Sequence, residues 1–395
     1  MTVSRPLSSL ITWPQVFALA GLQGAISLSW VAYRAYLPKL FEQIGLTIAF
    51  ASSILVFEAL IGLLLEPVMG FTSDRLRQWM GTRFPLIALG VILAAILFVT
   101  IPIVVRGGES GQLVLPILVI GWAIAMTMFR SPMLVLLGTC ATPKSLPRAA
   151  SVVMLVSMTI SAFAAITSQA LLRLGAGVTF AVGSLVLMLA VGVLWFVLPR
   201  SETSTPEAIY SGQTTGIVIS ESPWLMLQGL RVILAAIAVA WSTRWLLGVV
   251  GSLPKTFSQL STPSLMVGFN VIAAFGCLGM GWLATRYGNV RCVVGTAAIA
   301  IPAILILSVT QNGIIAVTCL LPLALLLGSA NTGAIPFALS VMPGRLGGLA
   351  IGLYFGALGA TFGTFDWVFG QLLGDLTQGK RKKKGNKNAK KRKLE

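Results

Sequence analysis

The chain contains no histidine and few charged side chains. Only 10% of its 395 residues are charged, and 11 of them are Asp or Glu. Without histidine the chain lacks the commonest metal ligand and the usual proton switch near neutral pH. So little charge, beside 56% hydrophobic residues, excludes an ordinary soluble protein, because such a protein needs a polar surface around its core.

Cysteine is also scarce, and its spacing fits no metal site. The four cysteines lie in or at the ends of apolar segments, so we interpret them as small packing residues: Cys140, Cys277, Cys292 and Cys319. A Walker loop, an HExxH motif and a nucleophile beside a base are all missing, and GSANTG from Gly328 is typical of helix packing. We therefore expect neither an enzyme nor a cofactor.

Long apolar segments are what the chain has in abundance. Each is about 20 residues long, enough for one helix to cross a hydrocarbon core of about 30 Å. The sequence therefore predicts an all-α integral membrane protein with about eleven transmembrane helices. They are expected near 13–37, 46–69, 84–105, 113–138, 149–172, 177–198, 226–250, 264–285, 291–310, 314–340 and 346–373.

A polar stretch divides these helices into two sets. Residues 199–225 are rich in Ser, Thr, Glu and Pro and are predicted to be a cytoplasmic linker. It would join a six-helix bundle, 1–198, to a second bundle, 226–375, in which five helices are expected. Residues 376–395 form a basic tail, and ten of the 28 Lys and Arg residues lie in the last sixteen positions. Such a tail binds anionic lipid or an acidic protein surface, or remains solvated and disordered; we do not expect nucleic acid as its partner.

One short stretch concentrates the charge that the chain otherwise lacks. GFTSDRLRQWMGTRFP, residues 70–85, contains one aspartate and three arginines, and GWLATRYGNVR, residues 281–291, follows the second helix of the second set. Thr285 stands where Asp74 does, and the other matching pairs are Gly70 with Gly281, Arg75 with Arg286, Gly81 with Gly288, and Arg83 with Arg291. The match predicts an internal repeat, with chance similarity of glycine-rich loops as the alternative.

The pattern formed by Gly70, Asp74, Arg75, Gly81 and Arg83 resembles the loop between helices 2 and 3 of the major facilitator superfamily, which repeats it in its second half. The longer gap before Gly81 is similar to the branch of sucrose/proton and glycoside-pentoside-hexuronide symporters, as are 20–30 and 335–340. The resemblance implies two pseudo-symmetric helical bundles that alternate around a central cavity. The family has twelve helices, so the twelfth would be missing, replaced or supplied by a partner subunit.

The resemblance also implies a role for the charged stretch. Asp74 would pair with an arginine or a helix N-terminus between the bundles, while Arg75 and Arg83 hold the loop to neighbouring helices and lipid phosphates. A simple positive-inside anchor is the alternative. Either role places this loop and the N-terminus in the cytoplasm, in agreement with an excess of Arg and Lys in the loops on that side. We expect a bacterial-type inner membrane or a thylakoid-like membrane.

Carboxylates within predicted membrane helices are candidate functional groups, because charge is costly there. Glu58 lies near the middle of the second helix, where the apolar surroundings favour a neutral carboxyl, so it is the proton-coupling candidate. A structural ion pair is the alternative. Arg130 would bind a solute or neutralise Glu58. Glu66, near the inner end of the same helix, would form a gate with Arg75 or Arg148.

Further solute-binding candidates lie beside aromatic side chains or offer neutral hydrogen-bonding groups. The first kind comprises Arg34, Arg244 and Asp366, and the second comprises Gln23 and Asn331. Aromatic rings beside polar groups suit a sugar, whereas interfacial aromatics with extended arginines are the structural alternative.

These features together predict a secondary active transporter that moves a glycoside-like solute with protons by alternating access. An assembly or carrier factor on the same scaffold is the rival, because a related branch is associated with bacteriochlorophyll and light-harvesting complexes; it would be a subunit of a larger membrane complex. An exporter of apolar compounds is a third possibility.

Overall fold

The computed structural model describes residues 11–108, 111–198, 223–256, 262–310 and 312–365. Within these ranges the chain is helical and contains no strand. Ten described helices are long and apolar enough to cross a membrane, or eleven if one bent pair counts as a span. The predicted all-α membrane fold with about eleven spans is therefore confirmed.

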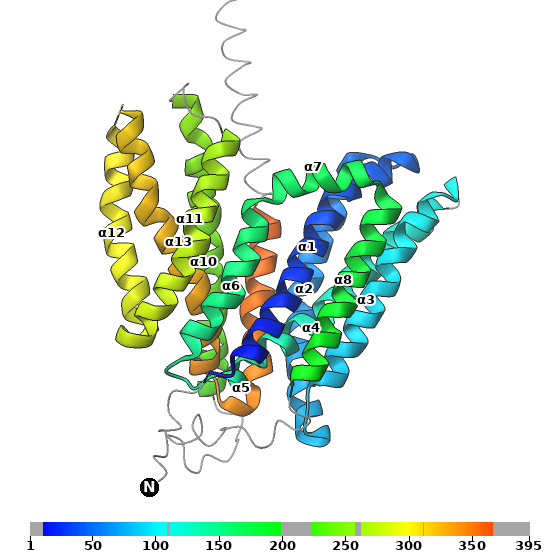
Figure 1. Cartoon of the computed structure of the whole chain (residues 1–395), viewed down its shortest axis with the longest axis horizontal. Coiled ribbons are helices and arrows are strands. Elements are labelled where there is room, and N and C mark those ends of the chain that lie inside the picture. Colours follow the sequence, from blue (N-terminus) through cyan, green and yellow to red (C-terminus); the bar gives the residue numbers. More distant parts are fainter. Residues whose placement is uncertain (1–10, 109–110, 199–222, 257–261, 311, 366–395) are drawn as a thin grey trace, which may run out of the picture.

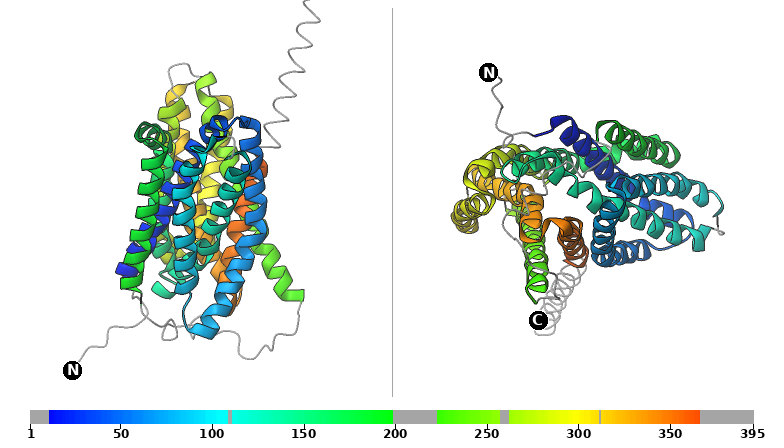
Figure 2. Two further views of the ribbon diagram at one scale, coloured as in Figure 1. Left: turned by 90° about the vertical axis from the view of Figure 1, so that its right-hand side faces the viewer. Right: turned by 90° about the horizontal axis from the view of Figure 1, so that it is seen from below.

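The helices form two groups, which stand on opposite sides of the molecule in Figures 1 and 2. The N-terminal helices are α1 (Trp13–Gln43), α2 (Ile48–Met80), α3 (Phe84–Val105), α4 (Gly111–Val135), α5 (Leu137–Cys140), α6 (Leu146–Ala162), α7 (Ala164–Leu174) and α8 (Ala176–Val197). The C-terminal helices are α10 (Pro223–Thr256), α11 (Thr262–Tyr287), α12 (Asn289–Val309), α13 (Gly313–Val341) and a last span, Gly344–Phe365, which opens with η4 (Gly344–Leu346). Most of the predicted linker, the basic tail and the end of the predicted 346–373 helix lie outside the described residues.

Helix α2 is longer than the sequence predicted, and this corrects the view of residues 70–85 as a loop. The helix begins after Thr47, whose hydroxyl accepts a hydrogen bond from the Phe50 amide at 3.2 Å, and continues to Met80. No glycine or proline interrupts residues 71–80, and Gly81, at φ +76°, ends the helix in the left-handed conformation. The charged residues Asp74 and Arg75 therefore sit on a rigid helix of about 50 Å.

The predicted fifth helix, 149–172, is broken. It divides into α6 and α7 at Phe163, and the two parts are bent by 65°. In Figure 1, α7 crosses the upper end of the N-terminal helices. The Leu171 carbonyl accepts hydrogen bonds from the Tyr36 hydroxyl at 2.8 Å and the Thr179 hydroxyl at 3.0 Å, so α1 and α8 hold α7 in this position.

The two groups of helices meet along two seams. In one seam α6 packs on α11, and the Cys277 thiol donates to the Met158 sulfur at 3.4 Å. In the other seam α2 packs on the last span through glycines. All four cysteines are buried and free, which agrees with their predicted packing role. We call the end of the bundle that carries Asp74 the Asp74 end, and the opposite end, where α3 stops, the Arg106 end.

Candidate functional site

Three buried carboxylates lie along α2 at intervals of eight residues. They are Glu58, Glu66 and Asp74, and successive members are about 12 Å apart along the helix axis. The segment 223–365 contains no Asp or Glu at all. Within the part of the chain that the structure describes, the C-terminal helices therefore have no carboxylate of their own, and any acid that they contact belongs to the N-terminal helices.

Glu58 is buried, and its partners lie on the N-terminal helices. Its Oε1 accepts a hydrogen bond from the Tyr33 hydroxyl, and Arg34 acts on it electrostatically. The Tyr33 ring packs on Trp122 with centroids 4.4 Å apart and edge-on against Trp30 at 5.6 Å. The hydroxyl donor of this carboxyl thus belongs to an aromatic cluster of the N-terminal helices.

Removing the Tyr33 hydroxyl tests how strongly Glu58 depends on it. We expect Tyr33→Phe to lower the stability of the protein by about 1–3 kcal/mol, because a buried acceptor loses its donor while the ring packing is kept. The thermal unfolding midpoint in detergent measures the effect. Glu58→Gln combined with Tyr33→Phe should cost less than the sum of the single changes, and strict additivity would show that the two groups do not interact.

Glu66 lies at the seam between the two groups of helices. Its Oε1 accepts from Arg130 Nη1 at 3.3 Å and its Oε2 accepts from the Ser131 hydroxyl, both on α4. The Arg130 guanidinium lies 4.8 Å from the ring centroid of Phe355, on the last span. One arginine thus joins an acid of the N-terminal helices to an aromatic ring of the C-terminal helices.

The backbone of α2 approaches the last span very closely beside Glu66. A Cβ atom added to Gly352 would overlap the Glu66 carbonyl oxygen and lie 2.7 Å from Pro67 Cα. Pro67 has no amide hydrogen, so the Leu63 carbonyl lacks its helical donor, and this carbonyl faces Gly356. Gly70 and Gly348 touch in the same way, which extends the contact to the Asp74 end.

Asp74 connects three segments at that end. Its Oδ1 accepts from Arg83 Nη2 at 2.8 Å and from the Gly348 amide at 2.9 Å, and its Oδ2 accepts from the Leu349 amide at 3.0 Å. Arg83 is 1% exposed and Asp74 is 2% exposed. The aspartate therefore has both kinds of partner that the resemblance implied: an arginine and a helix N-terminus, the latter favouring negative charge.

The repeated stretch in the second half lacks this charge. Gly281 also packs closely, against Pro147 and Ser151 of α6, but less closely than Gly70 packs on the last span. The Thr285 hydroxyl, however, donates to the Gly281 carbonyl of its own helix at 2.8 Å. The α6–α11 seam is therefore a contact of small residues at this end, while the α2 seam also contains a carboxylate.

The remaining predicted residues are spread over the bundle. Gln23 donates to the Ser157 hydroxyl at 3.4 Å, and Asn331 donates to the Leu327 carbonyl of its own helix at 2.9 Å. The cationic side chains mostly lie over rings: Arg34 over Trp30, Arg75 over Phe71, Arg244 over Phe362, and Arg286 over Trp282 and Tyr287. Arg291 and Gly288 are exposed near the start of α12, and Asp366 lies outside the described residues.

Two predicted pairings are wrong. Arg130 contacts Glu66 and not Glu58. The two glutamates are separated by about 12 Å along α2, and Arg130 faces Glu66, which is nearer the Asp74 end. Glu66 pairs with this arginine and not with Arg75, which is exposed, or Arg148, which lies over Trp13. Glu58 and Arg130 therefore do not form one shared site.

Sequence reasoning also missed several members of the site. They are Tyr33, Ser131, Phe355 and the glycines of the last span. Two signals were available: the eight-residue spacing of the acids on α2, and Gly348, Gly352 and Gly356 at every fourth position, which is typical of close helix packing in membranes.

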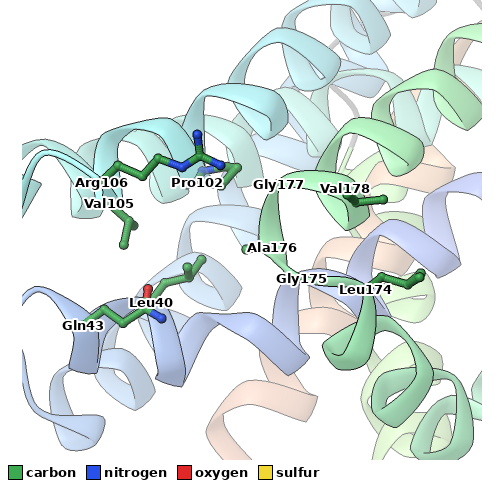
Figure 3. A pocket seen from close by; sticks show the side chains of 10 residues that line it. All are labelled: Leu40, Gln43, Pro102, Val105, Arg106, Leu174, Gly175, Ala176, Gly177 and Val178. Carbon is green, nitrogen blue, oxygen red and sulfur yellow. The ribbon is translucent and has the colours of Figure 1, made fainter.

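A cavity of about 400 Å³ opens at the Arg106 end. It is lined by the ends of α1, α3 and α7 and the start of α8, and Figure 3 shows Arg106 and Gln43 on different walls of it. No predicted site residue lines this cavity. It lies within the N-terminal helices and is separate from the seam that contains Glu66.

Comparisons with known proteins agree on one scaffold. A sequence model of the Major Facilitator Superfamily matches residues 7–364. Among solved structures, the human organic anion transporter MFSD10 (TETRAN) is similar with a TM-score of 0.64 and 14% identity over 91% of this chain and 92% of the other. The outward conformation of the transporter FucP gives 0.61 and 14% over 90% and 91% of the two chains. An outward-facing bacterial homologue of the iron transporter ferroportin, soaked with iron, gives 0.60 and 15% over 89% and 92%.

Proposed function

Because the chain belongs to the Major Facilitator Superfamily, we propose that it is a secondary active transporter that moves a small polar organic solute, of the glycoside class, together with protons. The observation that carries the proposal is Glu58, a carboxyl buried in the middle of a membrane span with a hydroxyl partner, Tyr33. A carboxyl in such surroundings is suited to bind and release a proton.

The arrangement of the seam supports transport by alternating access. The halves touch through small residues and a few polar contacts at the Asp74 end, so the contact can break as a rigid-body motion. Arg130 is 27% exposed at this seam and offers further N–H donors beside the Phe355 ring. A planar donor group next to an aromatic ring suits the hydroxyls and the apolar face of a sugar.

We further propose that the Asp74 end faces the cytoplasm and that the basic tail binds anionic lipid or an acidic protein partner. The described connections and helix ends on that side carry Arg83, Lys144, Arg148 and Arg345, in the sense of the positive-inside rule. A bacterial-type inner membrane or a thylakoid-like membrane fits this orientation. The tail would add to the same charge bias at such a surface.

Vesicles reconstituted with the purified protein test the proposal. We expect a proton gradient to drive accumulation of a radiolabelled glycoside, and Glu58→Gln to abolish accumulation while exchange of labelled for unlabelled solute continues, because exchange needs no net proton movement. Arg75→Gln, at an exposed site on the same helix, should leave both activities unchanged. Absence of flux with co-purification of pigment-protein subunits would support an assembly factor instead, and efflux of apolar compounds would support an exporter.

A further inference from the structure

We infer that Glu66 is a second protonation site and that it, together with Arg130, links proton binding to the separation of the two halves. The inference rests on the proposed transport cycle, because it concerns the motion that this cycle requires. It assigns to Glu66 a role distinct from that of Glu58.

The two glutamates differ in what a rigid-body motion of the halves does to them. The Tyr33 hydroxyl and Arg34, both on α1, act on Glu58, and the Tyr33 ring packs on Trp30 and Trp122 of the N-terminal helices. These helices move as one unit in such a motion, so Tyr33 and Arg34 move together with Glu58. Glu58 therefore keeps these partners when the seam opens.

Glu66, in contrast, is buried by the opposite half. The residue is 3% exposed, and Gly352 of the last span rests directly on its carbonyl oxygen. Gly356 also lies close to Glu66: a Cβ atom added to this glycine would be 3.3 Å from the Glu66 Cβ. Separation of α2 from the last span removes this cover, so water reaches Glu66 only when the seam is open.

The charged group that acts on Glu66 is itself held by both halves. Arg130 pairs with Glu66 Oε1 at 3.3 Å, longer than the 2.7–2.9 Å of a strong charge-assisted hydrogen bond. Its guanidinium also lies over Phe355 of the opposite half. The residues of the last span that face Glu66 and Arg130 are Gly352, Phe355 and Gly356. On α2 itself, the next acids are Glu58 and Asp74, each about 12 Å from Glu66 along the helix.

The sign of the linkage follows from solvation. Water stabilises an ionised carboxylate better than the closed seam does, where one long ion pair and one hydroxyl are the partners of Glu66. Deprotonation of Glu66 therefore favours separation of the halves, and acidic pH favours the closed seam. Any group with this behaviour couples proton movement to alternating access.

Ser73 offers a reporter for the seam. It is 0% exposed, and a Cβ added to Gly348 would lie 2.8 Å from its hydroxyl oxygen, so Ser73 faces the last span. Thr72 is exposed on the same helix. In a variant without the four native cysteines, Ser73→Cys is labelled by a soluble thiol reagent only when the seam opens. Thr72→Cys reports the intrinsic pH dependence of labelling.

The experiment measures the ratio of these two labelling rates in vesicles without solute. In the otherwise unchanged protein we expect the ratio to fall about tenfold between neutral and acidic pH. In Glu66→Gln it should be low and independent of pH. In Glu58→Gln it should keep its pH dependence. Ser131→Ala, which keeps the carboxyl but removes one donor, should shift the midpoint of the transition. Size-exclusion profiles establish that each variant is folded.

A ratio that still depends on pH in Glu66→Gln, or that loses the dependence in Glu58→Gln alone, would overturn the inference. If Glu66→Gln does not fold, Ser131→Ala becomes the deciding variant. An unchanged midpoint of its pH-dependent labelling transition then overturns the inference. The labelling assay needs no transported solute. Failure to find any transported solute therefore counts against the proposed function, while the dependence of labelling on Glu66 is judged separately.

Discussion

Gly352→Ala should open the seam between α2 and the last span and reduce solute uptake. The added methyl group would overlap the Glu66 carbonyl and approach Pro67 Cα to 2.7 Å. The obstacle is backbone and cannot rotate away. Overpacking of this kind costs about 1–3 kcal/mol, which lowers the population of the closed state about five- to 150-fold.

Gly359→Ala provides the matched control for this change. It lies on the same helix, and a Cβ added there meets no atom within 4 Å. We expect it to leave uptake and the labelling of Ser73→Cys unchanged, whereas Gly352→Ala raises labelling at every pH and slows uptake. Equal behaviour of the two alanine variants would show that close contact at Gly352 is not required for transport.

Asp74→Asn should produce the largest loss of stability among the charged positions. Arg83 is 1% exposed, and the substitution leaves its guanidinium buried without a carboxylate. Breaking a buried ion pair by removing one partner costs about 3–5 kcal/mol. The two amides at the start of the last span, Gly348 and Leu349, also lose their charged acceptor. The unfolding midpoint in detergent should fall, and labelling of Ser73→Cys should rise.

Two comparisons make the Asp74 result specific. Arg75→Gln changes an exposed side chain one residue away, for which we expect less than about 0.5 kcal/mol. Arg83→Gln combined with Asp74→Asn should cost less than the sum of the two single changes, since the second change removes the charge that the first leaves unpaired. Additive costs would mean that Asp74 acts mainly through the helix N-terminus and not through Arg83.

The membrane fold was predictable because hydropathy is a local property. Apolar length and the sparing use of charge locate the spans to within a few residues, as in α3, where the predicted 84–105 and the observed Phe84–Val105 coincide. Local signals failed where helices bend or continue. Glycine at position 70 suggested the end of a helix, yet in the structure it provides close packing against Gly348 inside α2.

The partners of the buried charges were not predictable by the same means. Sequence identified Glu58, Glu66 and Arg130 as costly residues for a membrane interior and placed Asp74 in a charged loop. Which arginine meets which acid depends on the rotation and the axial offset of helices that are far apart in the chain. A shift of about two turns along α2 decides whether Arg130 faces Glu58 or Glu66. Hydropathy contains no information on this axial offset between α2 and α4.

By itself the sequence determined that this protein crosses the membrane many times and that three of its eleven acids, Glu58, Glu66 and Asp74, follow one another at intervals of eight residues. Tertiary structure alone decided that Glu66 lies at the seam beside Arg130 and Phe355, while the hydroxyl partner of Glu58 is Tyr33 of α1. The physical reason is that burial in lipid depends on the composition of each segment, whereas contact between the halves depends on glycines of the last span that let two backbones touch.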